Sequence, residues 1–281
     1  MPVFEVKNIS FRYDKYDENA SYNIDDISFS VDRGDFVALI GKSGSGKSTI
    51  VSHLNGLKKA DKGDILYEGK SIYDKDFDLT SLRFKCGVVF QHPEYQLFSE
   101  TVIEDVEFGA LKKGLSKDEA RLRAIEALSF LGIENLKDEV PFNLSGGEKR
   151  KVAFAGVLVM DPDVFILDEP DAGLDSKTKN DFYMMIKNLN VLKGKTIIFI
   201  THNLDDVIEY ANKVIVVNDG KVERCGNPTD ILMNDELLSK CGLVEPYAID
   251  IYNYLKNRGI LIDKSKLKFD DIVQELNRVL L

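Results

Sequence analysis

The segment Gly41-Lys-Ser-Gly-Ser-Gly-Lys-Ser-Thr49 constrains the fold more than any other part of this chain. The apolar run Phe36–Ile40 before it is typical of a buried strand, and the residues from Ile50 have the apolar spacing of a helix. The glycines permit backbone angles that other residues resist, so consecutive N–H groups can turn inward around an anion. The dipole of the following helix adds about half a positive charge at the same point. A flexible Gly/Ser turn is the alternative, but the strand–loop–helix context favours a phosphate-binding loop.

This loop predicts nucleotide binding and supplies the first group of candidate site residues. Lys47 can reach the β- and γ-phosphates of a nucleotide, and the hydroxyl of Ser48 can ligate Mg²⁺. The residues predicted to bind the nucleotide here are Gly41, Lys42, Ser43, Gly44, Ser45, Gly46, Lys47, Ser48 and Thr49.

Strands and helices alternate from Val164 onward, which indicates a parallel sheet with helices on its faces. In such a sheet, ligands lie at the carboxyl ends of the strands. Gln91, Asp168 and His202 each follow an apolar strand, so we expect them to converge on the phosphate-binding loop. The alternation of strands and helices therefore predicts a fold of the α/β class.

Two carboxylates, Asp168 and Glu169, follow the apolar strand Val164–Leu167. Asp168 at the strand end suits a Mg²⁺ position, reached through water or through Ser48. Glu169 can face the γ-phosphate and polarise a water molecule. Many strands end in acidic residues, so this pair is informative only together with the phosphate-binding loop. For His202, an ordinary hydrogen-bonded histidine is the alternative.

The N-terminal part reads as short strands at residues 4–6, 9–13, 27–31 and 36–40. Alternation of apolar residues at Ile27, Phe29 and Val31 suggests a sheet with one buried face. Tyr13 ends a strand before a polar loop, where its ring can stack on a base. A half-buried strand tyrosine is the alternative.

A second anion site is predicted at Ser145, Gly146 and Gly147, at the start of a helix. The alternative is a serine N-cap followed by a glycine turn. Two phosphate sites in one chain are explained if the two sites meet across a dimer. The helix Lys117–Leu131 has a capping box at Ser116 and Glu119, with an apolar stripe predicted at Leu122, Ile125, Leu128 and Leu131.

Composition excludes some classes of function. The chain has 281 residues and a formal net charge of -10, which argues against nucleic-acid binding because phosphate backbones favour a basic surface. No apolar run reaches the roughly 18 residues that span a bilayer, and the N-terminus has no basic-then-apolar signal. We therefore expect synthesis and retention on the cytosolic side.

Together these motifs resemble the nucleotide-binding subunits of ABC transporters over about residues 3–226, most specifically in Leu144-Ser-Gly-Gly-Glu148, the family signature. The resemblance implies a P-loop NTPase fold: a RecA-like parallel sheet core, an antiparallel β subdomain and a helical subdomain at about 97–160. It implies ATP and Mg²⁺ as ligands, and a head-to-tail dimer with two ATP molecules between the subunits.

The resemblance also assigns roles to single residues. Tyr13 is similar to the adenine-stacking aromatic, and residues 41–49 to the Walker A loop. Ser145, with Gly146 and Gly147 of the signature, would close on the γ-phosphate of the other subunit's ATP. The predicted catalytic residues are Glu169, the switch histidine His202 and the Q-loop glutamine Gln91; the predicted metal ligands are Ser48, Gln91 and Asp168.

A narrower resemblance is carried by residues 91–109 and 155–162, and by Pro141-Phe142 before the signature. These stretches resemble the second ATPase paralogue of energy-coupling factor importers of vitamins and metals. This implies a heterodimer with a paralogous ATPase, a homodimer being the alternative. It also implies a transmembrane coupling subunit and a substrate-binding membrane subunit, with this chain peripheral on the cytoplasmic side of the cell membrane.

Three aromatic or aliphatic residues after Gln91 are expected to line a groove for a membrane helix: Tyr95, Leu97 and Phe98. Packing inside the helical subdomain is the alternative. One position departs from the family pattern, because Asp171 stands where Thr or Ser is usual. An extra carboxylate near two ATP molecules is repelled unless it pairs with a base. The sequence therefore does not decide whether the adjacent ATP site is active.

We expect two domains, an ATP-binding domain at 1–226 and a helical extension at 227–281 whose apolar face serves dimerisation. The rival functions are the homodimeric ATPase of a dedicated cobalt or nickel importer and a non-transport ABC ATPase. The sequence does not identify the transported substrate, because substrate contacts would lie in other chains.

Overall fold

The computed structural model describes residues 2–15, 21–260, 262–264 and 266–280, and it divides into two compact units. The first unit comprises residues 1–51, 59–73 and 200–281, and the second comprises residues 52–58 and 74–199. The phosphate-binding loop and His202 therefore lie in the first unit. Gln91, the signature segment and Asp168 lie in the second.

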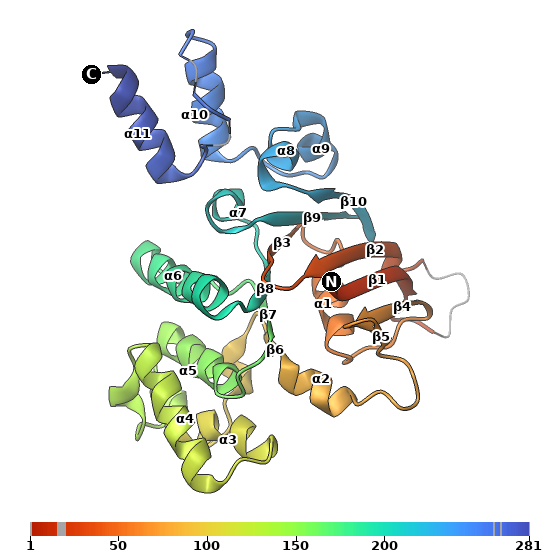
Figure 1. Cartoon of the computed structure of the whole chain (residues 1–281), viewed down its shortest axis with the longest axis vertical. Helices are drawn as coiled ribbons and strands as arrows, with labels where there is room; N and C mark the ends of the chain where they lie inside the picture. The colour runs from red at the N-terminus through yellow and green to blue at the C-terminus, as the bar shows by residue number, and fades with distance from the viewer. Residues whose placement is uncertain (1, 16–20, 261, 265, 281) are drawn as a thin grey trace. The chain divides into compact units, whose positions relative to one another are not determined.

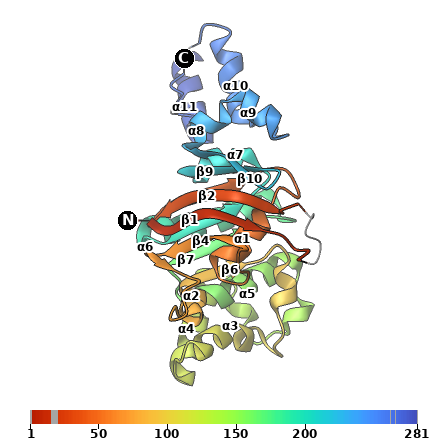
Figure 2. The same cartoon turned by 90° about the vertical axis from the view of Figure 1, so that its right-hand side faces the viewer.

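The first unit contains an antiparallel sheet of strand order β2-β1-β4-β5, visible in Figures 1 and 2. It also contains β3, which pairs in parallel with β9, and β10, which pairs antiparallel with β9. The strands are β1 (Pro2–Phe11), β2 (Ile24–Asp32), β3 (Phe36–Ile40), β4 (Lys62–Tyr67), β5 (Lys70–Ser71), β9 (Lys213–Asn218) and β10 (Lys221–Gly226). The helices are α7 (Leu204–Tyr210), α8 (Pro228–Leu232), α9 (Asp235–Lys240), α10 (Tyr247–Lys256) and α11 (Phe269–Leu280), while α1 (Lys47–Leu54) begins in this unit.

Alternation explains how these strands bury one face. Ile27 and Val31 of β2 are fully buried, as the pattern predicted, but Phe29 between them is partly exposed. Two expected N-terminal strands are one strand, β1, which bends where its register with β2 shifts between Val6 and Ile9. Asn8 at the bend has a φ of 51°, and this irregularity interrupted the alternation that suggested two strands.

The second unit places β8 (Thr196–Ile200), β7 (Val164–Asp168) and β6 (Cys86–Val89) side by side, with β6 and β7 parallel. Its helices are α2 (Leu79–Lys85), α3 (Val102–Lys112), α4 (Lys117–Phe130), α5 (Gly146–Leu158) and α6 (Ser176–Lys193), with short 3-10 turns η1 (Pro93–Gln96), η2 (Glu134–Leu136) and η3 (Pro141–Asn143). Every residue of β6 and β7 is buried, which explains their continuous apolar sequences.

Aromatic side chains fill the core of the second unit. The ring of Phe154 in α5 lies 5.7 Å from Phe165 of β7 and 5.2 Å from Phe182 of α6, measured between ring centroids. Tyr183 of α6 lies 5.9 Å from Phe199 of β8. These rings join two helices and two strands, so the start of α6 is anchored to the sheet.

Helix α4 confirms the capping box at Ser116 and Glu119 but corrects its apolar stripe. The buried residues of this helix are Ala120, Ala124, Ala127 and Leu128, whereas Leu122 is 59% exposed. A strict three-residue spacing drifts by about 60° per step on a helix of 3.6 residues per turn. Leu128 and Leu131 of the predicted stripe are buried, as expected, whereas Leu122 at its start faces away from the packed side, which small alanines occupy.

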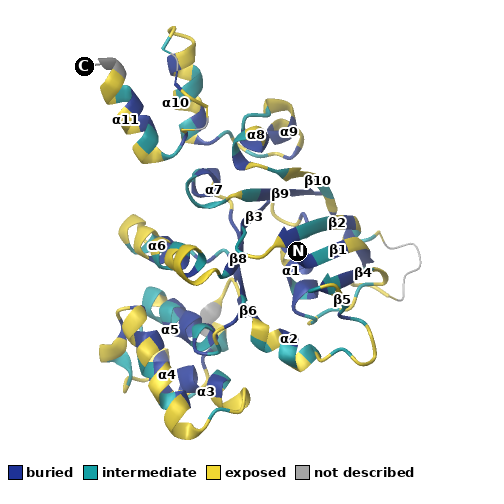
Figure 3. Cartoon of the chain, in the orientation of Figure 1, coloured by how far each residue is buried: buried dark blue, intermediate teal, exposed yellow. Residues whose placement is uncertain are grey.

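The C-terminal helices show partial burial (Figure 3). Ile249 in α10 and Ile272 in α11 are buried, while Tyr247 and Phe269 are 77% and 75% exposed. Within the described part of the chain, no helix is both long and apolar enough to cross a membrane.

Candidate functional site

The predicted phosphate-binding loop connects the end of β3 at Ile40 to the start of α1 at Lys47. Gly41 has a φ of 150°, and a Cβ placed on it would lie 2.1 Å from the carbonyl oxygen of Val217 in β9. Gly46 has a φ of 106°, and its Cβ would lie 2.8 Å from Ile24 Cγ2. No side chain fits at either position, because Gly41 lies against the backbone of Val217 and Gly46 against the side chain of Ile24.

The loop is also tied to the β9–β10 turn. The N–H of Gly220 donates to the carbonyl of Ser45 at 3.1 Å, and Lys42 pairs with Asp219 at 2.8 Å. Sequence reasoning missed this attachment, because residues about 175 positions apart give no local pattern. Ser43, Gly44 and Ser48 are exposed, while Ser45 is buried under the loop.

Lys47 is buried, and its ammonium group lies inside the loop. Its Nζ donates to the carbonyl oxygens of Gly41 at 2.7 Å and Lys42 at 3.0 Å. The positive charge is therefore held within the loop, as binding of a phosphate requires.

Tyr13 lies two residues beyond the end of β1 rather than on the strand, and its side chain is 55% exposed. Its hydroxyl is 3.2 Å from the hydroxyl of Thr49, and its ring packs edge-on against Phe11 at 5.1 Å. The exposed aromatic is thus fixed beside the end of the phosphate-binding loop. This position suits the predicted stacking on a base.

In the second unit, the two predicted carboxylates lie at the carboxyl end of β7. Asp168 is the last residue of β7 and is 6% exposed, and Glu169 has a φ of 47°. The Nε2 of Gln91 donates to Oε2 of Glu169 at 2.7 Å. Because its nitrogen is engaged, the carbonyl oxygen of Gln91 is the end of the amide that can bind a cation.

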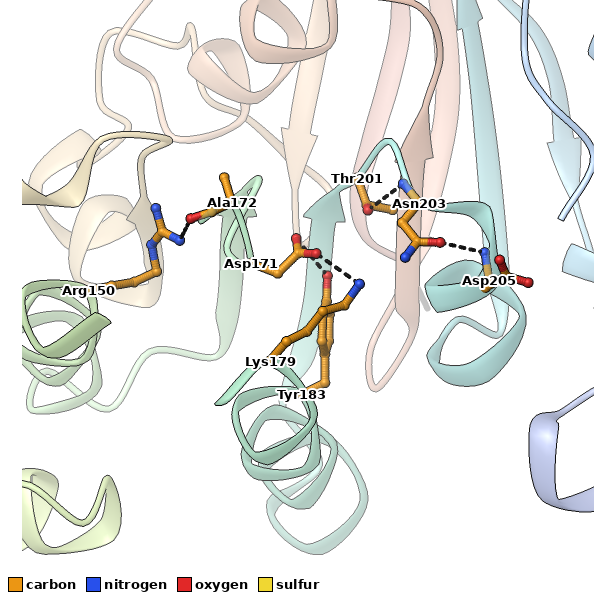
Figure 4. A network of polar contacts seen from close by, with 8 residues as sticks. All are labelled: Arg150, Asp171, Ala172, Lys179, Tyr183, Thr201, Asn203 and Asp205. Carbon is orange, nitrogen blue, oxygen red and sulfur yellow. Dashed lines mark hydrogen bonds and ion pairs between the residues drawn. The ribbon is translucent and has the colours of Figure 1, made fainter. Parts of the chain in front are cut away.

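His202 follows β8 and is exposed. The residues on both sides of it are fixed by hydrogen bonds (Figure 4). The N–H of Asn203 donates to Thr201 Oγ1 at 3.0 Å, and Asn203 Oδ1 accepts from Asp205 N at 3.0 Å as the cap of α7. The imidazole is therefore carried on a short, well-defined turn.

The signature segment begins α5 and bears out the N-cap interpretation of Ser145. Its hydroxyl accepts from Glu148 N, while Ser145 N and Oγ donate to Glu148 Oε2 at 2.9 and 2.6 Å. These two hydrogen bonds, the side-chain one first, lower the pKa of Glu148. The Ser-x-x-Glu spacing predicts this capping box, but the sequence interpretation recognised it only at Ser116.

A hollow of 290 Å³ opens beside the start of α5, between the signature and the loop that follows Glu169. A Cβ on Gly147 would lie 3.5 Å from Leu174 Cδ2, so the two segments are in close contact. The lining residues are Ser145, Gly147, Glu148, Lys151, Gly173, Leu174, Asp175 and Thr178.

Asp171 pairs with a base. This is the arrangement expected for a carboxylate that is not repelled by the nearby ATP. Its Oδ2 lies 3.1 Å from Lys179 Nζ, and its Oδ1 accepts from the Tyr183 hydroxyl at 3.3 Å (Figure 4). Arg150 Nη1 donates to the carbonyl oxygen of the next residue, Ala172. Neither base was recognised from the sequence.

The three predicted groove residues differ in how far they are exposed. Tyr95 and Phe98 are 84% and 58% exposed, but Leu97 is only 5% exposed. The expectation for Leu97 was wrong, because this side chain packs in the interior of the helical region. The backbone N–H groups of Phe98 and Ser99 both donate to the buried carboxylate of Asp105, which fixes this orientation.

Comparison with known proteins agrees with this geometry. The family model described as ABC transporter matches residues 24–172. The chain is 42% identical, over all of its length and 98% of the relative, to "Energy-coupling factor transporter ATP-binding protein EcfA2" of Caldanaerobacter subterraneus subsp. tengcongensis. The protein of the same name from Bacillus subtilis is 41% identical, covering 89% of this chain and 92% of the relative.

Solved structures give the same result. The cbiO1 structure from Clostridium perfringens, described as part of the ABC transporter complex cbiONQ, has a TM-score of 0.74 and 38% identity, covering 85% of this chain and 94% of that chain. An ATP-binding cassette solved as a dimer in a post-hydrolysis state with ADP and Pi has a TM-score of 0.73 and 32% identity, covering 80% and 98%.

The chain therefore belongs to the ABC transporter family, as an ATP-hydrolysing subunit with the P-loop NTPase fold. Within that family it belongs with the ATP-binding proteins of energy-coupling factor transporters.

Proposed function

We propose that this chain drives uptake of a vitamin or metal ion through a transmembrane coupling subunit, working as a pair with a paralogous ATPase. The observation that carries the proposal is the 2.7 Å hydrogen bond between Gln91 and Glu169. By its resemblance to the Q-loop glutamine, Gln91 is proposed to sense the membrane partner, and this hydrogen bond joins it to Glu169, the carboxylate proposed to polarise water. One contact thus supports a direct link between hydrolysis and transport.

The nucleotide is proposed to bind at residues 41–49, with Lys47 neutralising the β- and γ-phosphates and Tyr13 stacking on the base. The donor set for Mg²⁺ consists of the Ser48 hydroxyl, the Asp168 carboxylate and the Gln91 carbonyl. These are hard oxygen ligands, which Mg²⁺ prefers. When bound, the ion would neutralise charge on the β- and γ-phosphate oxygens.

Glu169 is proposed to accept a proton from the attacking water while Gln91 holds its carboxylate in place. His202 is proposed to contact the γ-phosphate from its turn after β8. Ser145, Gly146 and Gly147 are proposed to bind the γ-phosphate of the partner's ATP. Since Glu148 engages both donors of Ser145, phosphate binding there would compete with the capping box.

The membrane partner is proposed to dock on the exposed aromatic rings of Tyr95 and Phe98. The ring of Phe98 contacts that of Phe108, which is 41% exposed, at 4.9 Å between centroids. Such rings suit an apolar helix-in-groove mode. This docking would place the chain peripherally on the cytoplasmic side of the cell membrane, with a substrate-binding membrane subunit in the same complex.

Substitution of Glu169 by Gln in the assembled transporter tests this function. The variant removes the carboxylate but keeps its shape, so hydrolysis should fall by roughly 10²–10⁴-fold while ATP binding persists and the ATP-bound dimer accumulates. Glu236→Gln on the exposed face of α9 is the matched control. Wild-type hydrolysis by Glu169→Gln would refute the assignment.

A further inference from the structure

The loop of residues 169–175 is held from two sides by polar side chains, and both sides lie in the second unit. Figure 4 shows Lys179 and Tyr183 reaching Asp171 on one side, and Arg150 reaching Ala172 on the other. Its far end is fixed as well, because Asp175 caps α6 through Lys177 N and Thr178 N, each at 3.0 Å.

The contact to α6 is a largely buried ion pair. The side chains of Lys179 and Asp171 are 17% and 16% exposed, and their charged atoms lie 3.1 Å apart. The Lys179 ammonium also lies 5.9 Å from the centre of the Tyr183 ring. Tyr183 is fully buried in the aromatic core, so Asp171 is attached to a rigid part of the unit.

The contact to α5 comes from the signature helix itself. Arg150 lies five residues after Ser145, is 8% exposed, and donates to the carbonyl oxygen of Ala172. A charged guanidinium donor forms a strong and directional hydrogen bond with a carbonyl oxygen. The signature helix and the loop are therefore joined directly.

These contacts act close to the predicted catalytic carboxylate. Ala172 N donates to Glu169 O at 3.2 Å, and Leu174 N donates to Asp171 O at 3.1 Å. Asp171 lies inside the turn that the first of these hydrogen bonds closes, so a shift of Asp171 displaces the backbone of Glu169. The φ of 47° at Glu169 also requires support from its surroundings.

We propose that Asp171 and Arg150 are positioning residues that hold the loop between α6 and the signature helix. They keep Glu169 and Ser145 of this chain at a fixed separation, although the two serve different ATP molecules in the dimer. Lys179 neutralises Asp171, so the carboxylate that departs from the family pattern acts as an anchor and does not repel ATP. This inference rests on the proposed roles of Glu169 and Ser145.

The test measures the kcat and KM of ATP hydrolysis in the assembled transporter. Asp171→Asn should lower kcat about tenfold and leave the KM for ATP within about threefold, because a misplaced catalytic group slows chemistry more than it weakens binding. The reciprocal exchange Asp171→Lys with Lys179→Asp should restore kcat to within about threefold of wild type. Arg150→Gln should lower kcat in the same way.

Two further variants keep the test informative if Asp171→Asn folds poorly. The double variant Asp171→Asn with Lys179→Gln leaves no unpaired buried charge, yet it still loses the anchor and should show the same fall in kcat. Asp181→Asn on the exposed side of α6 is the matched control and should keep wild-type kcat.

Wild-type kcat in both Asp171→Asn and the neutral double variant would overturn the inference. So would a lowered melting temperature with unchanged kcat per folded enzyme, which marks a purely structural contact. The proposed function would survive either result if Glu169→Gln abolishes hydrolysis. Wild-type hydrolysis by Glu169→Gln would overturn both.

Discussion

Leu97 and Phe98 are adjacent, yet substitutions at these positions are expected to change different properties of the protein. Leu97 is 5% exposed, whereas Phe98 and the nearby Tyr95 are 58% and 84% exposed. Hydrogen bonds from Phe98 N and Ser99 N to Asp105 Oδ2, at 2.8 and 2.9 Å, hold the backbone in this orientation. One side chain therefore stabilises the fold, and its neighbours are available to a partner.

The expected magnitudes follow from burial. Leu97→Ala should lower the free energy of unfolding by about 2–5 kcal/mol, the usual cost of truncating a buried leucine. Replacing Tyr95 and Phe98 with Ser removes mainly exposed area, with about 0.5–1.5 kcal/mol lost from the contact between Phe98 and Phe108. On docking, the exposed parts of the two rings would bury about 200–350 Å². This area would contribute at most about 5–9 kcal/mol to the free energy of binding.

Two assays separate these effects. Urea unfolding of the isolated chain should show a large loss of unfolding free energy for Leu97→Ala. The loss should be small for the Tyr95→Ser, Phe98→Ser double variant. Affinity for the membrane subunits should fall at least about 30-fold in the double variant, a cost of about 2 kcal/mol that is typical of interface hot spots. Nucleotide affinity of the double variant should not change, because residues 41–49 are untouched.

Leu122→Ser is the matched control, since Leu122 is 59% exposed on α4 and should affect neither property. The reasoning fails if the double variant unfolds in isolation, which would make these rings part of the core. It also fails if the double variant assembles with unchanged affinity.

Three further outcomes are expected. Lys47→Ala should abolish tight ATP binding in a titration, because the charge inside the loop is lost; unchanged affinity would contradict the site. Gly41→Ala should also remove ATP binding, since its Cβ would lie 2.1 Å from the Val217 carbonyl, and retained binding would show that the loop can relax. The pKa of Glu148 is lowered from 4.5, so the stability from its capping box is fully present above that value and is lost as pH falls through the lowered pKa. The difference in unfolding free energy between wild type and Glu148→Ala should therefore shrink in acid, and a difference that stays constant with pH would exclude this origin.

The sequence by itself determined the features whose cause is local. The phosphate-binding loop is readable because a strand, three glycines and a helix start follow one another within a few residues. Strand β7 can be recognised because both of its faces are buried, so every residue from Val164 to Leu167 is apolar. The capping boxes at Ser116 and Ser145 are also local, since both partners lie within four residues.

Only the tertiary structure decided which side chains at irregular positions are buried or paired. Leu97 is interior and Phe98 exposed because Asp105 of α3 accepts hydrogen bonds from the backbone N–H groups of Phe98 and Ser99. Leu122 is exposed because alanines on the opposite side of α4 allow close packing. The charge of Asp171 is neutralised because Lys179 of α6 forms an ion pair with it. Such contacts depend on how the chain turns between one segment and the next, and no fixed spacing along the chain encodes that path.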